Sequence, residues 1–152
     1  MADHVDIATR SKIMRGVKSK NTSPEVSVRR YLHCHGYRFR LHRKDLPGKP
    51  DLILPKYRLA IFIHGCFWHR HEECFYSSTP KTRTEFWINK FKKNKERDSF
   101  QQKKLIDMGW RVLIIWQCGI RHERKSLSSI FEKIESNETF SEWPESAPKP
   151  AK

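Results

Sequence analysis

Long apolar runs are missing from this sequence. No stretch approaches the roughly 18 apolar residues of a membrane span, and the N-terminal MADHVDIATR lacks the apolar segment of a secretory signal. No internal repeat is present either. A chain of 152 residues with 37% hydrophobic composition suits one compact domain. We therefore expect a single-domain protein of the cytoplasm that does not bind membranes.

Acidic residues are also scarce. Asp and Glu total 17 against 31 Lys and Arg, which gives a formal net charge of +14. The excess lies in two blocks, because residues 1–50 carry 12 basic and 4 acidic side chains and residues 81–104 carry 9 and 3. Two basic blocks around a neutral, apolar centre are typical of a polyanion binder. The alternatives are a merely soluble basic protein or a membrane-surface binder, but no long basic amphipathic stretch supports the latter. The charge pattern therefore predicts a nucleic acid partner.

The order of expected elements indicates an α/β fold with a central mixed sheet flanked by helices. Thr22 and Glu25 have capping-box spacing at the start of a helix that we expect to end near Gly36. Apolar patterns and turn signals predict the other elements. These are strands at 37–42, 51–54, 57–63 and 111–118, and helices at 84–107 and 126–136, with 65–83 irregular. We expect a basic arm at 1–20, a domain at 21–136 and a disordered tail at 137–152.

Residues 66–74, CFWHRHEEC, concentrate metal-ligand side chains. Cys66, His71 and Cys74 have spacings that can wrap one Zn²⁺ tetrahedrally, with His69 as a competing nitrogen. A closed structural site needs a fourth ligand, for which Cys118 at the end of a buried strand is the best candidate. Cys34 is explained as well by burial in its helix. Free thiols, or two disulfides in a secreted chain, are the alternatives to zinc.

Asp51 is the candidate for a second metal. It follows Pro50 and begins an apolar strand, next to a strand that ends at Ile63 and His64. A carboxylate at a strand end, beside the carbonyls of its neighbour, can hold Mg²⁺. Such an ion can polarise a phosphodiester and activate water. A solvated turn aspartate is the ordinary alternative.

Several motifs in a consistent order extend this interpretation. They are PGKPDLILPKYRLAIFIHGCFWHRH, TRTEFW, NKERD and GWRVLIIWQC. Together they closely resemble the very short patch repair (Vsr) endonucleases over roughly residues 1 to 120. The resemblance implies a restriction-endonuclease-like fold and an enzyme that nicks double-stranded DNA at a thymine–guanine mismatch, with catalytic Mg²⁺ and structural Zn²⁺. It makes other mismatch-repair proteins candidate partners. We expect a monomer, because nicking one strand needs only one active site.

The resemblance also implies roles for individual residues. Asp51 would bind Mg²⁺ together with the main-chain carbonyl of Ile63. His69 would activate the attacking water and Asp98 would orient it, with His64 and Glu25 in support. The zinc ligands would be Cys66, His71, Cys74 and Cys118, and the side chains inserted into the base stack would be Phe67, Trp68, Trp87 and Met14.

The chain departs from the family pattern in two places. Ile63 stands where the best-known pattern has threonine, a change that a main-chain ligand survives. Two residues separate His71 from Cys74, where one is usual. Simpler explanations also exist: Glu25 as a helix cap, His64 as a backbone donor, Asp98 as a solvated charge and Trp87 as a core residue. The rival functions are a restriction-type endonuclease acting on paired duplex and a non-catalytic, zinc-stabilised DNA-binding module.

Overall fold

The computed structural model describes residues 23–41, 43–72, 74, 76–122 and 127–145. The expected N-terminal arm, with Met14 and the capping residue Thr22, lies outside this part of the chain. Among the described helices, none combines the length and the apolar content that crossing a membrane requires.

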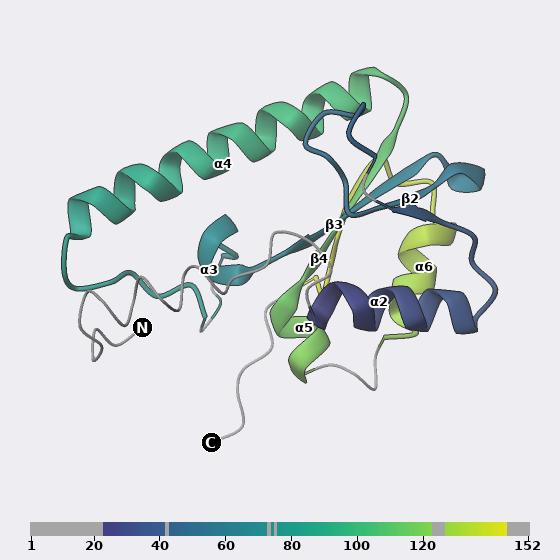
Figure 1. Cartoon of the computed structure of the whole chain (residues 1–152), viewed down its shortest axis with the longest axis horizontal. Coiled ribbons are helices and arrows are strands. Elements are labelled where there is room, and N and C mark those ends of the chain that lie inside the picture. Colours follow the sequence, from purple (N-terminus) through teal and green to yellow (C-terminus); the bar gives the residue numbers. More distant parts are fainter. Residues whose placement is uncertain (1–22, 42, 73, 75, 123–126, 146–152) are drawn as a thin grey trace.

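The chain forms an α/β structure in which helices flank one mixed sheet (Figure 1). The strands are β1 (Arg40–Leu41), β2 (Leu52–Leu54), β3 (Leu59–His64), β4 (Arg111–Trp116) and β5 (Phe140–Trp143). The helices are α2 (Ser23–Cys34), the 3₁₀ turn η1 (Pro55–Tyr57), α3 (Cys66–His69), α4 (Thr84–Asp107), α5 (Gln117–His122) and α6 (Ser129–Glu135). The predicted helix over 84–107 is thus confirmed.

The sheet order is β1-β2-β3-β4-β5. The first three strands pair antiparallel, whereas β3 with β4 and β4 with β5 pair parallel. In the central pair, Leu59 lies opposite Arg111 and His64 lies opposite Trp116. The predicted mixed sheet is therefore confirmed, and its two most buried long strands, β3 and β4, end together at one edge.

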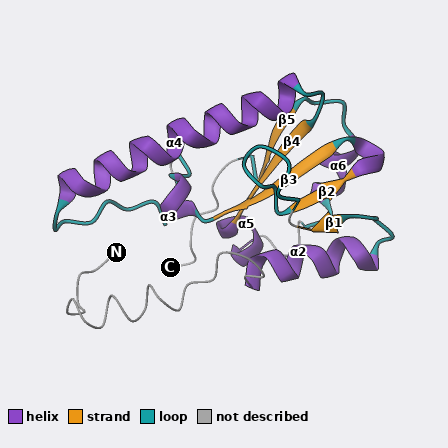
Figure 2. Cartoon of the chain, turned by 45° about the horizontal axis from the view of Figure 1, so that its top comes forward, coloured by secondary structure: helices purple, strands orange, loops and turns teal. Residues whose placement is uncertain are grey.

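Alternate side chains of the central strands supply two separate cores. Leu59 and Ile61 of β3 face α2, α5 and α6, whereas Ala60 and Phe62 face the side that α4 covers. Figure 2 shows α4 on one side of the sheet and α2 with α5 on the other. Leu113 and Ile114 of β4 divide in the same way. This burial on both faces explains the nearly continuous apolar sequence of β4.

Helix α4 both covers the sheet and extends past it. Its C-terminal part buries Leu105 in the core beneath it, and the helix ends before Gly109, which has φ +90°. Its N-terminal half runs beyond the sheet, with the short helix α3 beside it (Figure 1). The part of α4 that extends past the sheet gives α3 a surface to pack against.

Four local expectations are wrong in whole or in part. Residues 140–143 are not a disordered tail but the edge strand β5, in which Trp143 is buried against Ser129. Residues 111–118 do not form one strand, because the chain turns into α5 at Gln117, and a short apolar run cannot distinguish strand from helix. Residues 66–69, within the segment expected to be irregular, form the helical turn α3. The strand predicted over 37–42 is limited to Arg40 and Leu41.

Candidate active site and metal centre

The site forms where the parallel strands β3 and β4 end. Each strand leads into a short helix, and the paired residues His64 and Trp116 are the last of their strands. Cys66 and Cys118 each follow two positions later, in the first turns of α3 and α5. Parallel pairing therefore brings together two cysteines that are far apart in sequence. Cys118 reaches this place from a helix and not, as expected, from the strand end.

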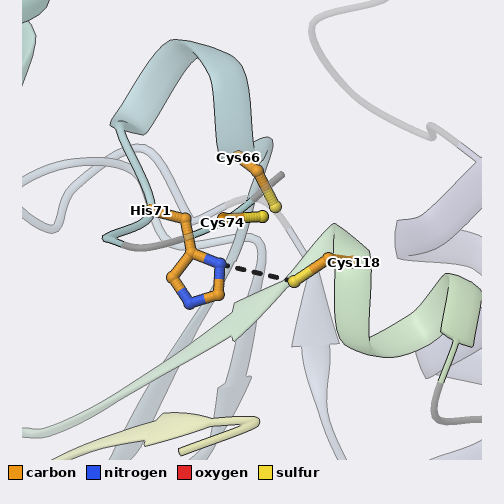
Figure 3. A group of neighbouring side chains, drawn as sticks. All are labelled: Cys66, His71, Cys74 and Cys118. Carbon is orange, nitrogen blue, oxygen red and sulfur yellow. Dashed lines mark hydrogen bonds between the residues drawn. The ribbon is translucent and has the colours of Figure 1, made fainter. Parts of the chain in front are cut away.

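Cys66, His71, Cys74 and Cys118 form one cluster (Figure 3). Their ligand atoms all lie within 4.8 Å of one another, and the Nδ1 atom of His71 lies 3.3 Å from the Cys118 sulfur. Tetrahedral zinc with bonds of about 2.3 Å holds thiolates about 3.8 Å apart, so this donor set fits a Zn²⁺ ion. The structure places His71 in the cluster and His69 outside it, and the longer spacing to Cys74 does not prevent closure. Cys34 is exposed and away from this group.

The electrostatics of the cluster favour a cation. Hydrogen bonding from Cys118, followed by His71 and Cys74, lowers the pKa of Cys66 to about 4. The same interaction with Cys66, together with burial, raises the pKa of Cys118. One thiolate therefore forms readily among its neighbours, whereas a second requires added positive charge, which a metal ion would supply.

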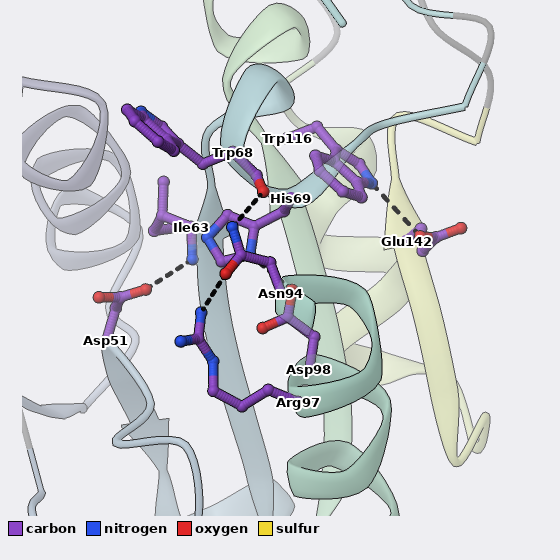
Figure 4. A network of polar contacts seen from close by, with 9 residues as sticks. All are labelled: Asp51, Ile63, Trp68, His69, Asn94, Arg97, Asp98, Trp116 and Glu142. Carbon is purple, nitrogen blue, oxygen red and sulfur yellow. Dashed lines mark hydrogen bonds and ion pairs between the residues drawn. The ribbon is translucent and has the colours of Figure 1, made fainter. Parts of the chain in front are cut away.

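Two side chains outside the cluster orient its histidine. The His71 ring stacks on the Trp116 ring, with centroids 4.2 Å apart and planes 10° apart. The Trp116 indole nitrogen in turn donates to Glu142 of β5 at 3.3 Å (Figure 4). The edge strand that the sequence did not predict thus supports the candidate metal centre.

His69 and Asp98 form the second functional group. Asp98 lies on α4, and its Oδ2 atom is 2.6 Å from Nδ1 of His69 (Figure 4). With Nδ1 committed to this carboxylate, Nε2 is the nitrogen left to accept a proton. The His64 ring stacks on His69 with centroids 3.7 Å apart and planes 8° apart. Burial, and then the neighbouring His69, lowers the pKa of His64 to about 3, so its ring is neutral.

This trio could be taken for another metal site, because its ligand atoms also lie within 4.8 Å of one another. The geometry argues otherwise. The nitrogen lone pairs of two parallel imidazoles point side by side in their own planes, so His64 and His69 do not converge on one ion. The arrangement suits proton transfer at His69, held by Asp98.

Asp51 and Glu25 form a pair of carboxyl groups, of which Glu25 is buried and Asp51 half-buried. Ile63 N–H donates to Oδ2 of Asp51 at 2.7 Å, and Arg29 donates to Glu25 at 2.7 Å. Burial raises the pKa of Asp51 to about 7, and a hydrogen bond with Glu25 contributes to this, although the Ile63 N–H opposes it. Adjacent carboxyl groups share either a proton or a cation. These oxygen donors fit Mg²⁺.

An aromatic cluster lies between α3 and α4. Phe67 packs edge-on against Trp68, Trp87 and Phe91, with centroids 5.1 to 5.6 Å apart. Phe67, Trp68 and Trp87 remain half-buried, so parts of their rings reach solvent. Trp87 and Asp98 share the face of α4 that contacts α3, as their spacing predicts. Packing against α4 thus keeps these rings from folding into the core.

Sequence reasoning missed Asn94 and Arg29. Asn94 is buried and donates from Nδ2 to the Trp68 carbonyl at 3.1 Å, which ties α3 to α4 (Figure 4). Asn94 comes three residues after Phe91 and four residues before Asp98, which puts all three on the same helical face, so the sequence did carry this signal. Arg29 follows Glu25 by one turn of α2. The resemblance named Glu25 of α2 for the active site, but no pattern in the sequence pointed to Arg29 as its partner.

The structure brings together all the described residues named from the sequence. Asp51, Ile63 and Glu25 form one group, and His64, His69 and Asp98 form another. Figure 4 shows Asp51 with Ile63, and His69 with Asp98. The Cys/His cluster is linked to the second group through the chain, because His71 follows His69 by two residues. Met14 alone falls outside the described residues.

A histidine held by a carboxylate, close to a pair of carboxyl groups that fit a divalent cation, is an arrangement suited to the hydrolysis of phosphate esters. Comparison with known proteins agrees with this class. The family profile described as DNA mismatch endonuclease Vsr matches residues 2–75. The chain is 44% identical to the DNA mismatch endonuclease Vsr of Escherichia coli over 136 residues, 89% of this chain and 86% of that protein.

Two further relatives carry the name type II nicking enzyme. V.XorIIP of Xanthomonas oryzae is 49% identical over 120 residues, 79% of this chain and 88% of its own. V.NmeAIP of Neisseria meningitidis is 39% identical over 137 residues, 88% and 97% respectively. The chain belongs to the Vsr family of DNA mismatch endonucleases, and it is an endonuclease.

Proposed function

We propose that this protein is a Mg²⁺-dependent endonuclease that nicks one strand of double-stranded DNA at a thymine–guanine mismatch, as in very short patch repair. The 2.6 Å contact between His69 and Asp98, next to the carboxyl pair of Asp51 and Glu25, is the observation that carries this proposal. Family membership and the names of the relatives support it.

The proposed chemistry divides among the residues of the site. Asp51 and the Ile63 carbonyl would hold Mg²⁺, which when bound supplies Lewis-acid polarisation of the scissile phosphate. Nε2 of His69 accepts the proton of the attacking water, and Asp98 fixes the tautomer and stabilises the resulting imidazolium. The neutral ring of His64 lies against His69 without adding a repelling charge. Glu25, held by Arg29, completes the acidic side of the site.

The remaining features suit a DNA substrate. Helix α4 exposes six lysines that can contact phosphates, namely Lys90, Lys92, Lys93, Lys95, Lys103 and Lys104. Phe67, Trp68 and Trp87 are proposed to insert beside the mismatch, where poor stacking reduces the unstacking cost of about a few kcal/mol per step. Met14 is proposed to act with them. A restriction-endonuclease-like fold accommodates these assignments.

The four Cys/His ligands are proposed to hold a structural Zn²⁺ that fixes α3 and α5 against each other. We further propose that the catalytic domain continues beyond residue 136 to include β5, since Glu142 supports Trp116. The protein would act as a monomer in the bacterial cytoplasm, with other mismatch-repair proteins as candidate partners.

A panel of labelled duplexes containing each mismatch, or none, incubated with Mg²⁺ tests this function. We expect one strand to break, next to the thymine of a thymine–guanine pair. Asp51→Asn should abolish the break but preserve DNA binding. Equal cleavage of paired duplex would favour a restriction-type enzyme instead. The absence of any Mg²⁺-dependent break would favour a binding module.

A further inference from the structure

Arg70 holds an unusual place in the site. It ends α3 in the left-handed conformation, with φ 56°, between His69 and His71. This backbone turn sends the chain from the His69 pair to the metal cluster. The half-buried side chain returns toward the aromatic cluster between α3 and α4 and does not extend into solvent.

The guanidinium is engaged by main-chain oxygens on two segments. It donates to the Phe67 carbonyl of α3 at 3.3 Å. It also donates to the carbonyls of Ser77 at 2.5 Å and Ser78 at 3.1 Å, and to the Thr79 hydroxyl at 3.2 Å. A planar group with several fixed donors can make such a set, whereas a lysine ammonium cannot match its geometry. Arg70 therefore fastens α3 to the loop that follows the metal ligands.

The face of the same guanidinium lies on the aromatic cluster. Its central carbon is 3.9 Å from the centroid of Phe91 and 5.7 Å from that of Phe67. Phe67 stands perpendicular to Phe91, at 5.1 Å between centroids, and contacts Trp68 and Trp87 as well. One side chain thus supports both the backbone and the ring of Phe67.

We propose that Arg70 is a positioning residue for mismatch discrimination, which braces Phe67 and its neighbours in the orientation that enters the base stack. This inference rests on the proposed function. Because contact with Arg70 already restricts the Phe67 ring, the ring loses little conformational freedom when it inserts into the base stack. More of the energy of its contact with the bases therefore remains to offset the cost of unstacking. Without Arg70, Phe67 can rotate or move toward Phe91. Discrimination between mismatched and paired duplex should then decrease more than the rate of hydrolysis does.

Arg58 provides a matched control at the opposite end of β3. It also ends a short helical turn in the left-handed conformation, with φ 47°. Its guanidinium lies 4.7 Å from the Trp110 centroid and donates to the carbonyls of Gly109 and Met108. Arg58 therefore makes the same kinds of contact as Arg70, away from the site.

The test compares Arg70→Lys with Arg58→Lys in the full zinc-loaded chain. Single-turnover cleavage gives the rate ratio between mismatched and paired duplex, and 2-aminopurine beside the mismatch reports unstacking. Zinc content and Tm are measured in parallel. We expect Arg70→Lys to lower the ratio about tenfold, or about 1.4 kcal/mol, and to remove most of the fluorescence increase, with zinc retained. Arg58→Lys should lower Tm comparably but keep the ratio.

The experiment distinguishes failure of the role of Arg70 from failure of the proposed mismatch specificity. Wild-type discrimination that persists in Arg70→Lys within twofold, or an equal loss in Arg58→Lys, overturns the role of Arg70 alone. A wild-type protein that treats both duplexes alike overturns the proposed mismatch specificity and this role with it. Should Arg70→Lys not fold, Phe91→Leu removes the stacked ring but leaves the hydrogen bonds of Arg70. It should lower the same ratio, and an unchanged ratio would count against the brace.

Discussion

Replacement of Asp98 by asparagine tests the proton-transfer pair most directly. Asp98 and His69 are 14% and 25% exposed, so water screens their 2.6 Å contact only partly. The amide of Asp98→Asn is uncharged and cannot stabilise the imidazolium that forms as His69 takes a proton. Its NH₂ group can also donate to Nδ1, which favours the tautomer that has no acceptor at Nε2.

The expected size follows from this one interaction. A hydrogen bond to a charged group contributes about 1.5–3 kcal/mol, and about 1.4 kcal/mol of barrier corresponds to tenfold in rate. Asp98→Asn should therefore slow cleavage about 10- to 150-fold. Because the pair is needed for the chemical step, the affinity for DNA should change by less than about threefold.

Single-turnover cleavage with enzyme in excess isolates that step. Asp107→Asn, an exposed change at the end of the same helix, controls for the loss of one negative charge on α4. A rate for Asp98→Asn within threefold of wild type, with DNA binding intact, would refute the role of this pair. Equal losses in both variants would instead indicate a general effect of charge.

Three other perturbations have defined outcomes. Burial and Glu25 raise the pKa of Asp51 to about 7, so protons should compete with Mg²⁺ below that pH. At low Mg²⁺, cleavage should fall as the pH drops through about 7, and higher Mg²⁺ should move this midpoint downward; a midpoint independent of Mg²⁺ would contradict the assignment. Cys118→Ser should lower stoichiometric zinc and Tm together, as metal analysis and thermal melts can check. Trp143→Ala should cost about 3–5 kcal/mol in denaturant unfolding, because Trp143 is 3% exposed; a change below 1 kcal/mol would mean that β5 adds little.

Much of the fold could be predicted because its signals are local. Helix α4 has polar helical periodicity and a terminal glycine, and α2 ends before Gly36, whose φ is +84°. Strand β4 was recognisable by its continuous apolar residues. Its end was not, because the apolar residues Trp116 and Cys118 on either side of Gln117 suit strand and helix alike. Strand β5 gave no signal, since its register depends on the edge that β4 presents.

The sequence alone determined which chemistry was available: thiols and imidazoles at metal-binding spacing, a carboxylate before a strand, aromatics beside them and an excess of positive charge. The tertiary structure decided how these groups pair. Parallel pairing of β3 and β4 set Cys118 against Cys66, α2 carried Glu25 to Asp51, and the packing of α3 against α4 brought Asp98 to His69. It also assigned His71 to the metal cluster and His69 to the carboxylate. Spacing along a chain limits which residues can meet, but only packing fixes where each side chain points.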